Sequence, residues 1–509
     1  MEPLVSIASR VFGYAQDKPL IFTEASFWIF FTILLAGYSF VYKAKTSRSL
    51  YLLIFSLFFY YKSSGLYFFL LIFSTICDYL IGWQVAKSRV EWKRKALVAL
   101  SVAINLGVLG YFKYAYLFTD WVNQLLGTSL QVNNYVAQVW NAISGSSIDT
   151  SSIILPVGIS FYTFQTISYT VDVYRRKVKP VKNIIDFGFY VSFFPQLVAG
   201  PIVRAAEFIP QLYQKYSLTQ RELGHAIFLI LNGLIKKVII SDYISINFVD
   251  RIFDAPLSYS GIENLLATYG YALQIYCDFS GYTDMAIGLA LMLGFKLPLN
   301  FNSPYKATSI TDFWHRWHIS LSSWLRDYLY IPLGGNKKGS IRTYANLMVT
   351  MLLGGLWHGA SIRFVVWGGI HGAMLALEKF FGKLIPLHRH HKPALLRFAG
   401  AIITFHVVCL SWIFFRASSM SSAYDMLGQI FTRFGGSQVV DVVMGYSPVM
   451  LAMLVGFGTH WFPVTWKESI RGLFIKLPLA VKVAIAALVV MALLQVKSAN
   501  VQPFIYFRF

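Results

Sequence analysis

Histidines in apolar surroundings are the residues of this chain best suited to chemistry. Four of the ten histidines lie in the stretch 302–372, as His315, His318, His358 and His371. His358 belongs to the segment GGLWHGA, where glycines interrupt an apolar run. A neutral imidazole can accept a proton from a hydroxyl group near physiological pH, and an ionisable group within a membrane-length apolar run usually has a function. His358 is therefore the leading catalytic candidate; the alternative is a structural histidine hydrogen-bonded between helices.

The other histidines of this stretch suggest less. His315 and His318 are three residues apart, so on a helix they would share one face, with a spacing that suits two metal ligands. Asp312 and Asp327 are the nearest carboxylates and complete no convincing set of three or four ligands, so we expect no metal site. His371 would point away from His358 on one continuous helix, and we expect it to be structural or at the margin of a cavity.

Basic and aromatic side chains are dense between positions 302 and 342. The arginines and lysines could donate to phosphates of a cytosolic substrate, although basic residues also gather in cytoplasmic loops. Those residues are Arg316, Arg326, Lys337, Lys338 and Arg342. The tryptophans and tyrosines of this stretch are typical of an aromatic belt at a membrane interface.

The composition predicts the kind of protein that surrounds these residues. The chain is 56% hydrophobic and only 13% charged, whereas soluble domains carry about 25% charged residues. We therefore expect an all-α polytopic membrane protein. The net charge of +21 is accounted for by Lys and Arg in cytoplasmic loops, and we expect no nucleic-acid partner.

Apolar runs long enough to cross a bilayer recur along the chain and predict about twelve crossings in a single integral membrane domain, residues 1–509. The main runs are 22–42, 66–86, 96–118, 153–173, 223–244, 265–293, 398–415, 449–462 and 477–494. Prolines and glycines break the run 187–212, which favours a re-entrant or buried segment. The stretch 302–342 is too polar to span and predicts short helices at the interface.

Two further segments carry polar residues. Asp278 and Asp284 in YCDFSGYTDMAIG are six residues apart, so they do not share a helix face and form no evident catalytic dyad. We expect them to be hydrogen-bonded inside the helix bundle. The last six residues, FIYFRF, contain Tyr506, which is either an interfacial anchor or a nucleophile that would need a base such as His358.

Several long motifs, in order, resemble the membrane-bound O-acyltransferase (MBOAT) superfamily, and in particular its bacterial alginate O-acetyltransferase (AlgI)-like branch. The motifs are LPVGISFYTFQTISYTVDVYR (155–175), FFPQLVAGPIVR (193–204), YCDFSGYTDMAIG (276–288), NFNSPYKATSITDFWHRWHISLSSWLRDYLYIPLGG (300–335) and GLWHGA (355–360). The resemblance covers most of the chain from about residue 155 onward, together with the tail.

The resemblance implies a disc of about 10–13 transmembrane or re-entrant helices with funnels from both membrane faces. It implies that His358 is the catalytic histidine and His318 the second functional histidine. The segment 302–372 would be the catalytic stretch. The tail 498–509 would carry an F-x-Y-x-x-F motif in which Tyr506 relays the acyl group.

We also expect several side chains near these positions to contact substrate. They are Trp317, Arg316, Ser320, Asp278 and Trp357. We expect no tightly bound cofactor; acetyl-CoA or another acyl thioester would be the donor substrate.

The resemblance further implies O-acetylation of an exopolysaccharide or another cell-envelope polymer across a bacterial inner membrane. The expected partners are a periplasmic acetyltransferase of the SGNH-hydrolase kind, the acyl donor, a polysaccharide acceptor and membrane lipids. Transfer of D-alanyl or another acyl group to a cell-wall polymer is an alternative. Alternatives of another class are a non-enzymatic polysaccharide or lipid transporter, and a structural subunit of an export complex.

Overall fold

The structure is a computed structural model that describes residues 13–14, 19–145, 147, 149–198, 200–384 and 393–496. Helices and loops account for all of these ranges, and no strand occurs in them. The all-α fold class predicted from composition is confirmed. The chain divides into two compact units, residues 1–198 with 202–216, and residues 199–201 with 217–509. Whether they act as one integral domain, as we expect, stays a prediction.

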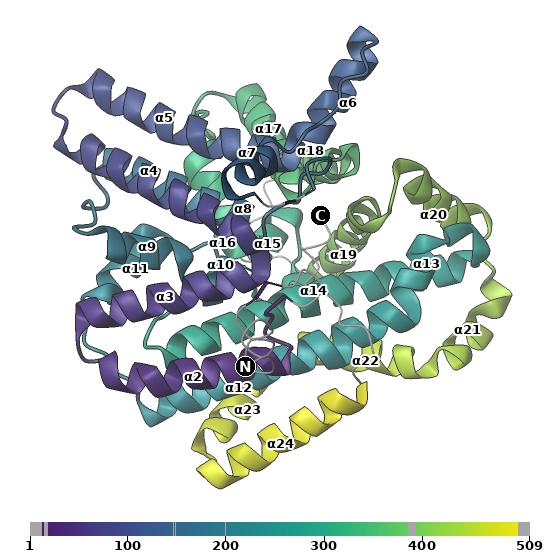
Figure 1. Ribbon diagram of the computed structural model, residues 1–509. Coiled ribbons are helices and arrows are strands. Elements are labelled where there is room, and N and C mark those ends of the chain that lie inside the picture. The colour runs from purple at the N-terminus through teal and green to yellow at the C-terminus, as the bar shows by residue number, and fades with distance from the viewer. Residues whose placement is uncertain are drawn as a thin grey trace. The chain divides into compact units, whose positions relative to one another are not determined.

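The first unit is built from helices that polar side chains join. Its helices are α2 (Ala25–Val41), α3 (Lys45–Ser64), η1 (Gly65–Tyr67), α4 (Phe68–Lys87), α5 (Glu91–Leu109), η2 (Gly110–Tyr114), α6 (Ala115–Leu126), α7 (Tyr135–Ser144), α8 (Ile159–Tyr174), α9 (Ile184–Ser192), α10 (Phe194–Leu197) and α11 (Ala205–Leu212). Helices α4 and α5 lie side by side (Figure 1).

The buried Asp78 carboxylate of α4 holds three of these helices together. It accepts hydrogen bonds from Ser101 and from Asn105 (Nδ2 to Oδ2, 2.7 Å) of α5, and from Thr170 (3.3 Å) of α8. Interhelical hydrogen bonds of this kind hold membrane helices together where apolar burial gives no preference. The predicted break in the run 187–212 is confirmed, since α9, α10 and α11 are separate short helices there.

The second unit contains every histidine of the stretch 302–372. Its helices are α12 (Gln220–Leu234), η3 (Ile235–Asp242), η4 (Ser245–Val249), α13 (Asp250–Asp254), η5 (Pro256–Ser258), α14 (Gly261–Met292), η6 (Pro304–Lys306), α15 (Ile310–Trp314), α16 (Ile319–Leu325), η7 (Arg326–Tyr330), α17 (Ser340–His358), α18 (Ile362–Leu384), α19 (Ala394–Arg416), α20 (Met420–Thr432), η8 (Gly436–Gln438), α21 (Val439–Gly445), α22 (Ser447–Trp461), α23 (Val464–Lys476) and α24 (Leu479–Val496). The short helices predicted for 302–342 are confirmed. Of these elements η3, η4 and η7 are π-helical.

Glycines let the long helix α14 lie against α12 at backbone distance. A Cβ at Gly233 would come within 2.5 Å of the Gly281 carbonyl oxygen, and one at Gly281 would lie 2.8 Å from the Gly233 carbonyl oxygen. About two turns further along α14, a Cβ at Gly288 would lie 2.7 Å from the Ala226 carbonyl oxygen. Small residues are the usual means by which membrane helices approach so closely. The two helices run alongside each other in Figure 1.

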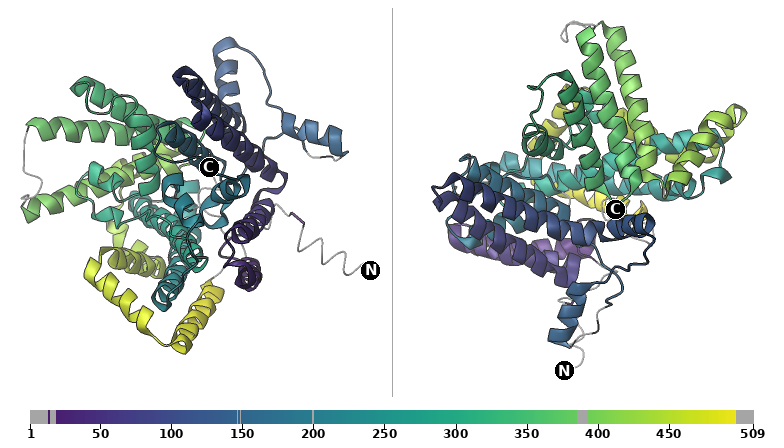
Figure 2. Two further views of the ribbon diagram at one scale, coloured as in Figure 1. Left: turned by 90° about the vertical axis from the view of Figure 1, so that its left-hand side faces the viewer. Right: turned by 90° about the horizontal axis from the view of Figure 1, so that it is seen from above.

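A second close pair, α17 and α18, forms a helical hairpin around Gly359. A Cβ at Gly355 would overlap the Phe364 carbonyl oxygen, and a Cβ at Gly368 would overlap the Met351 carbonyl oxygen. Helix α18 also lies beside α19 (Figure 2, right). The hairpin and α19 supply most of the aromatic rings around His358.

Five helical segments of the described chain are long and apolar enough to cross a membrane, and seven are if two bent helix pairs count as spans. The bends are 91° between Gly436–Gly445 and Ser447–Trp461, and 117° between Val464–Lys476 and Leu479–Gln495. Other expected crossings fall on helices that are shorter or more polar: α2 has 17 residues, and α14 carries the carboxylates of Asp278 and Asp284. The chain is a multi-pass membrane protein, and the larger count of twelve crossings stays a prediction.

Candidate active site

His318 lies at a break between two short helices. Its backbone has φ +43° and ψ +55°, the left-handed conformation that few residues other than glycine adopt. The prediction that His315 and His318 share a helix face is wrong, because this conformation ends the helical path between them. His315 caps the C-terminal end of α15 and is exposed, whereas His318 is the N-cap residue of α16 and is fully buried. Strained backbone of this kind persists where surrounding contacts over-determine it, often at functional sites.

Asn300 holds the His318 ring in place. The Asn300 Oδ1 atom accepts hydrogen bonds from the Ser320 backbone N–H (3.1 Å) and from Ser320 Oγ (2.9 Å). His318 Nδ1 lies 3.2 Å from the same oxygen. A backbone N–H can only donate, so the side-chain atom that faces it must be the amide oxygen. The oxygen in turn requires His318 Nδ1 to be the protonated nitrogen.

The tautomer and charge of His318 follow from this contact. With Nδ1 protonated, a neutral imidazole carries its lone pair on Nε2, where it can accept a proton or a hydrogen bond. Burial lowers the pKa of His318 to about 3, because charging the ring would cost its hydration. The Phe279 ring packs edge-on against the imidazole at 4.7 Å between centroids. His318 is thus held neutral and in one tautomer, as a proton acceptor must be.

His358 is the last residue of α17 and lies in an aromatic cage. Its ring centroid lies 4.9 Å from Trp357, 5.0 Å from Trp367 and 5.3 Å from Phe415, all in edge-to-face geometry. The side chain is 3% exposed. The helix ends here because Gly359 continues in an extended conformation, and a Cβ at Gly359 would overlap the Phe364 ring.

Trp357 connects the two histidines. Its ring centroid lies 6.2 Å from that of His318 and 4.9 Å from that of His358. The structure therefore brings together the two residues that the sequence proposed as catalytic. It also places Trp357, an expected substrate-binding residue, between them.

His371 belongs to the same aromatic cluster, which the sequence did not anticipate. The turn after His358 folds α18 back along α17, so the two histidines are not on one helix. His371 packs 4.9 Å from Trp367, the ring that also contacts His358. Its Nε2 lies 2.9 Å from Ser411 Oγ, whose own proton goes to the Val408 carbonyl oxygen. Ser411 therefore accepts from His371, an arrangement that anchors α18 to α19.

Three of the other expected substrate-binding residues lie close to His318 in the chain. Ser320 is buried on Asn300, and Trp317 is buried between Phe301 and Trp412, with centroids at 5.1 Å from each. Arg316 is partly exposed and pairs with Asp312 at 2.8 Å. A role of these residues in binding substrate stays a prediction.

Of the remaining basic candidates, Arg326 pairs with Asp327 at 2.7 Å, whereas Lys337, Lys338 and Arg342 are exposed. Asp312 and Asp327 are thus engaged by arginines. No group of three or more His, Cys, Asp or Glu side chains is arranged to hold a metal ion within the ranges that the structure covers.

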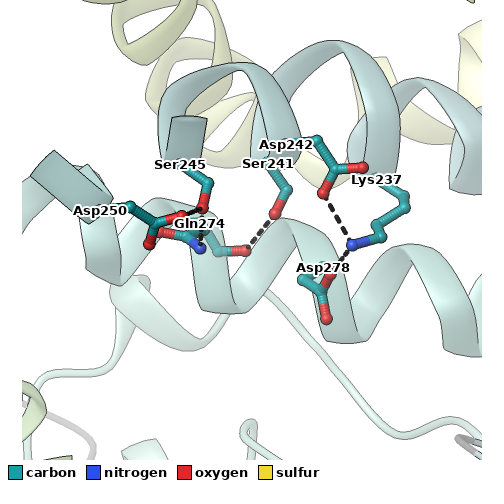
Figure 3. A network of polar contacts seen from close by, with 7 residues as sticks. All are labelled: Lys237, Ser241, Asp242, Ser245, Asp250, Gln274 and Asp278. Atoms are coloured by element: carbon teal, nitrogen blue, oxygen red, sulfur yellow. Dashed lines mark hydrogen bonds and ion pairs between the residues drawn. The ribbon is translucent and has the colours of Figure 1, made fainter. Parts of the chain in front are cut away.

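Asp278, the last of the expected substrate-binding residues, faces another helix. Its carboxylate forms an ion pair with Lys237 of η3 (Figure 3). Asp284 likewise pairs with Lys236 at 2.7 Å and accepts from Asn232 at 2.8 Å. The expectation that both carboxylates are bonded inside the bundle is confirmed. Tyr506 lies outside the described residues.

The loop that leads into this site is held by the chain around residue 460. The backbone N–H of Tyr305 donates to His460 Nε2 (3.2 Å), and Lys306 Nζ donates to the Phe462 carbonyl oxygen (2.8 Å). Lys467 Nζ bridges Ser303 Oγ (2.9 Å) and the His460 carbonyl oxygen (2.7 Å).

Helix α15 is anchored as well. The Glu378 carboxylate of α18 accepts from the Ile310 and Thr311 backbone N–H groups, the second at 3.0 Å. A carboxylate at a helix N-terminus satisfies donors that the helix leaves unpaired.

Sequence reasoning missed several residues that define the geometry. They are Asn300, Phe279, Trp367, Phe415 and Glu378. Asn300 was visible as a polar residue at the start of the motif that contains His318, but nothing in its spacing showed that it would bond that ring. Trp367 and Phe415 lie in apolar runs, where an aromatic residue is usually ordinary core.

The fold and the site together define a class of protein: a helical multi-pass membrane protein with two buried histidines. The profile of the MBOAT, membrane-bound O-acyltransferase family, matches residues 175–420. The chain is 36% identical to a probable alginate O-acetylase AlgI of Pseudomonas putida over 470 residues, which is 86% of this chain and 89% of that protein. It is 36% identical to a peptidoglycan O-acetyltransferase of Helicobacter pylori over 83% of this chain and 81% of the relative. It is 30% identical to a teichoic acid D-alanyltransferase of Bacillus subtilis over 51% of this chain and 68% of the relative.

The chain belongs to the membrane-bound O-acyltransferase family and is an acyltransferase. The family resemblance read from the motifs is confirmed. Membership in an enzyme family also sets aside the transporter and the structural subunit as its principal roles.

Proposed function

We propose that this chain is an O-acetyltransferase that moves an acetyl group from a cytosolic acyl thioester, across a bacterial inner membrane, for O-acetylation of an exopolysaccharide or another cell-envelope polymer. The observation that carries the proposal is the pair of buried histidines on Trp357, one of them held neutral with its lone pair on Nε2. Relatives named for O-acetylation match more of the chain, at 36% identity, than the relative named for D-alanylation, at 30%. Acetyl is therefore the favoured acyl group.

The proposed chemistry needs a base and a hydroxyl group. The base takes the hydroxyl proton while the oxygen attacks the thioester carbonyl carbon, and the C–S bond then breaks to release a thiolate, which takes up a proton. The products are an acetyl ester and a free thiol. A positioned base contributes about 10²–10⁴-fold to such a step. We assign the base to His358, aided by His318 in orienting the hydroxyl or the base.

The compartments explain why such a centre would lie within a membrane protein. An activated thioester is available in the cytosol, whereas the polymer lies outside, so the reacting groups must meet between the two. Tyr506 is the proposed relay: its phenol would accept the acetyl group and pass it to a periplasmic acetyltransferase partner that modifies the polymer. A phenol with its ordinary pKa of about 10 needs a base to act as a nucleophile, which is the role given to His358.

The test is peptide mass spectrometry of the purified full chain after incubation with isotopically labelled acetyl-CoA. We would compare the wild type with His358→Ala, His318→Ala and Tyr506→Phe. The proposal expects label on the peptide that contains Tyr506 in the wild type, and none in His358→Ala or Tyr506→Phe. Labelled D-alanyl thioester and other acyl thioesters serve as matched donors.

Three other outcomes would change the proposal. Acetylated polymer formed with a partner, but without label on the protein, would remove Tyr506 from the path and leave direct transfer. If the wild type accepts a D-alanyl thioester but not acetyl-CoA, the proposed acyl group would be D-alanyl in place of acetyl. Full polymer acetylation by the His358→Ala variant would contradict the assignment of the base.

A further inference from the structure

A lysine is buried between two carboxylates on the segment that joins α12 to α13. Lys237 lies in the π-helical element η3 and its side chain is 1% exposed. Its ammonium pairs with Asp242 Oδ1 at 2.7 Å and with Asp278 of α14 (Figure 3). Removing one partner of a buried ion pair leaves an uncompensated charge, so the pair firmly fixes η3 against α14.

The polar contacts continue along the same face of the segment. Ser241 donates to the Gln274 carbonyl oxygen (3.1 Å), and Gln274 Nε2 donates to Ser245 Oγ (2.8 Å). Ser245 in turn donates to Asp250 Oδ2 (2.7 Å), as Figure 3 shows. We call the residues Lys237, Ser241, Asp242, Ser245 and Asp250 the polar strip.

The polar strip also reaches α19. Arg416, the last residue of that helix, donates from Nη2 to Asp250 Oδ1 at 2.6 Å and lies over the Phe253 ring. The strip thus holds α14 at one end, through Asp278, and α19 at the other end, through Arg416.

Each of these two charged residues is the chain neighbour of an aromatic residue that packs on a histidine of the site. Phe279 follows Asp278 and contacts His318 at 4.7 Å between centroids. Phe415 precedes Arg416 and contacts His358 at 5.3 Å. A shift or rotation of α14 or α19 would therefore move one wall of one histidine.

We propose that the polar strip positions the two histidines, with Lys237 acting on His318 through Asp278 and Phe279, and Asp250 acting on His358 through Arg416 and Phe415. Lys237 and Asp250 are positioning residues that do not touch the reacting groups. Four of the five strip residues lie on the π-helical elements η3 and η4, and Asp250 is the first residue of α13. Such π-helical elements are rare overall but are often found at functional sites. The inference rests on the proposed function, in which both histidines take part in transfer.

The neighbouring ion pair provides a matched control. Lys236 and Asp284 join the same two elements at 2.7 Å, but their side chains are 21% and 15% exposed. The chain neighbours of Asp284 are Thr283 and Met285. Neither is aromatic, so Asp284 has no counterpart of the Phe279 ring that links Asp278 to His318. Loss of this pair should weaken packing without moving the site.

The experiment compares Lys237→Met, Lys236→Met and the exchanged pair Lys237→Asp with Asp278→Lys in the purified full chain. Transfer kinetics are measured with the donor that the wild type uses. A displacement of about 1 Å can cost a hundred-fold in rate, so we expect Lys237→Met to lower kcat at least ten-fold, with KM for the donor within about three-fold. We expect Lys236→Met to stay within about three-fold of the wild type, and the exchanged pair to recover most of kcat.

A second readout does not depend on the donor. Diethyl pyrocarbonate modifies histidines, and peptide mass spectrometry gives the rates for the His318 and His358 peptides separately. We expect Lys237→Met to change the His318 rate, Asp250→Asn to change the His358 rate, and Lys236→Met to change neither. Should Lys237→Met not fold, the exchanged pair and Asp250→Asn carry the test.

Equal losses of kcat in Lys236→Met and Lys237→Met, with unchanged modification rates, would overturn the inference and reduce the strip to ordinary packing. A wild type that transfers no acyl group from any thioester would refute the proposed function instead. In that case the modification rates would still decide whether the strip positions the histidines.

Discussion

The rings of His318 and His358 both pack against the indole of Trp357, with centroid distances of 6.2 and 4.9 Å. The two histidines belong to different segments, but Trp357 is the chain neighbour of His358. The separation of the histidines is therefore set by how the His318 segment packs on a single side chain.

Substitutions of Trp357 can test whether its indole sets the separation of the two histidines. Trp357→Leu removes the flat ring between the histidines, whereas Trp357→Phe keeps an aromatic surface of smaller size. We expect Trp357→Leu to lower kcat about ten-fold or more and Trp357→Phe to cost clearly less, because misplacement of reacting groups is expensive. Trp466→Leu, at an exposed position, controls for the loss of a tryptophan. Equal activity of the Leu and Phe variants would show that the indole does not set the separation.

Asn300 is predicted to fix the tautomer of His318. Asn300→Leu removes the oxygen that accepts from Nδ1, and we expect a loss of kcat of about a hundred-fold, because His318 in the wrong tautomer could no longer orient the hydroxyl group or the base His358. Asn300→Asp keeps an acceptor but adds a negative charge, which raises the pKa of His318. The acid limb of its pH–rate profile should therefore move to higher pH, since His318 takes up a proton sooner.

Ser320→Ala is the matched control for Asn300. It removes one of the three donors to Asn300 Oδ1 while the His318 contact remains. We expect an unshifted pH profile, because the contact that sets the tautomer of His318 is unchanged. An Asn300→Asp enzyme whose profile coincides with that of the wild type would contradict the assigned contact.

The pKa of His318 also predicts how stability depends on pH. In the folded protein this pKa is about 3, against about 6.5 for an unfolded histidine. Between these values only the unfolded chain binds the proton, so stability falls as the pH is lowered from 6.5, by about 1.4 kcal/mol per pH unit at most.

The measurement is thermal unfolding of the detergent-solubilised chain at pH 7 and pH 4.5. His318→Gln cannot take up this proton, and its unfolding temperature should fall less between the two pH values than that of the wild type. The same fall in both proteins would show that His318 is not buried in the neutral form.

Two adjacent glycines of α18 give a sharp test of the hairpin. A Cβ at Gly368 would overlap the Met351 carbonyl oxygen of α17, whereas a Cβ at Gly369 would lie 3.6 Å from Leu352 Cδ2, an ordinary contact. Overpacking costs about 1–3 kcal/mol, so Gly368→Ala should lower both the unfolding temperature and kcat. Gly369→Ala should leave both nearly unchanged. Comparable losses in the two variants would refute the close approach of α17 and α18.

The sequence predicted the parts of this protein that depend on local chemistry. Composition predicted the helical membrane class, the prolines and glycines of 187–212 predicted the broken segment, and the GGLWHGA setting singled out His358. The prediction for His315 and His318 failed because the left-handed backbone of His318 is imposed by tertiary contacts. Spacing along the chain carries no signal of that kind.

Contacts between distant segments were likewise beyond the sequence. The bond between Asn300 and His318 depends on how the chain folds over the eighteen positions that separate them. The contact of Trp367 with His358 exists only once the chain reverses at Gly359, and it then gives His358 and His371 a shared aromatic neighbour. Asp278 could be foreseen as bonded within the bundle, but its partner Lys237 could not be distinguished from the adjacent Lys236.

The lysine contacts around residue 460 show how much of the chain an active fragment must keep. The family profile ends at residue 420, and every histidine of the site lies before that point. Yet Lys467 and the carbonyl of Phe462 hold Ser303 and Lys306, at the entrance to the short helices that carry His318. A truncation at residue 420 would keep both histidines but remove the contacts that support the loop before His318. We therefore expect deletion mapping of this enzyme to show a loss of activity that the absence of the proposed relay Tyr506 does not explain by itself.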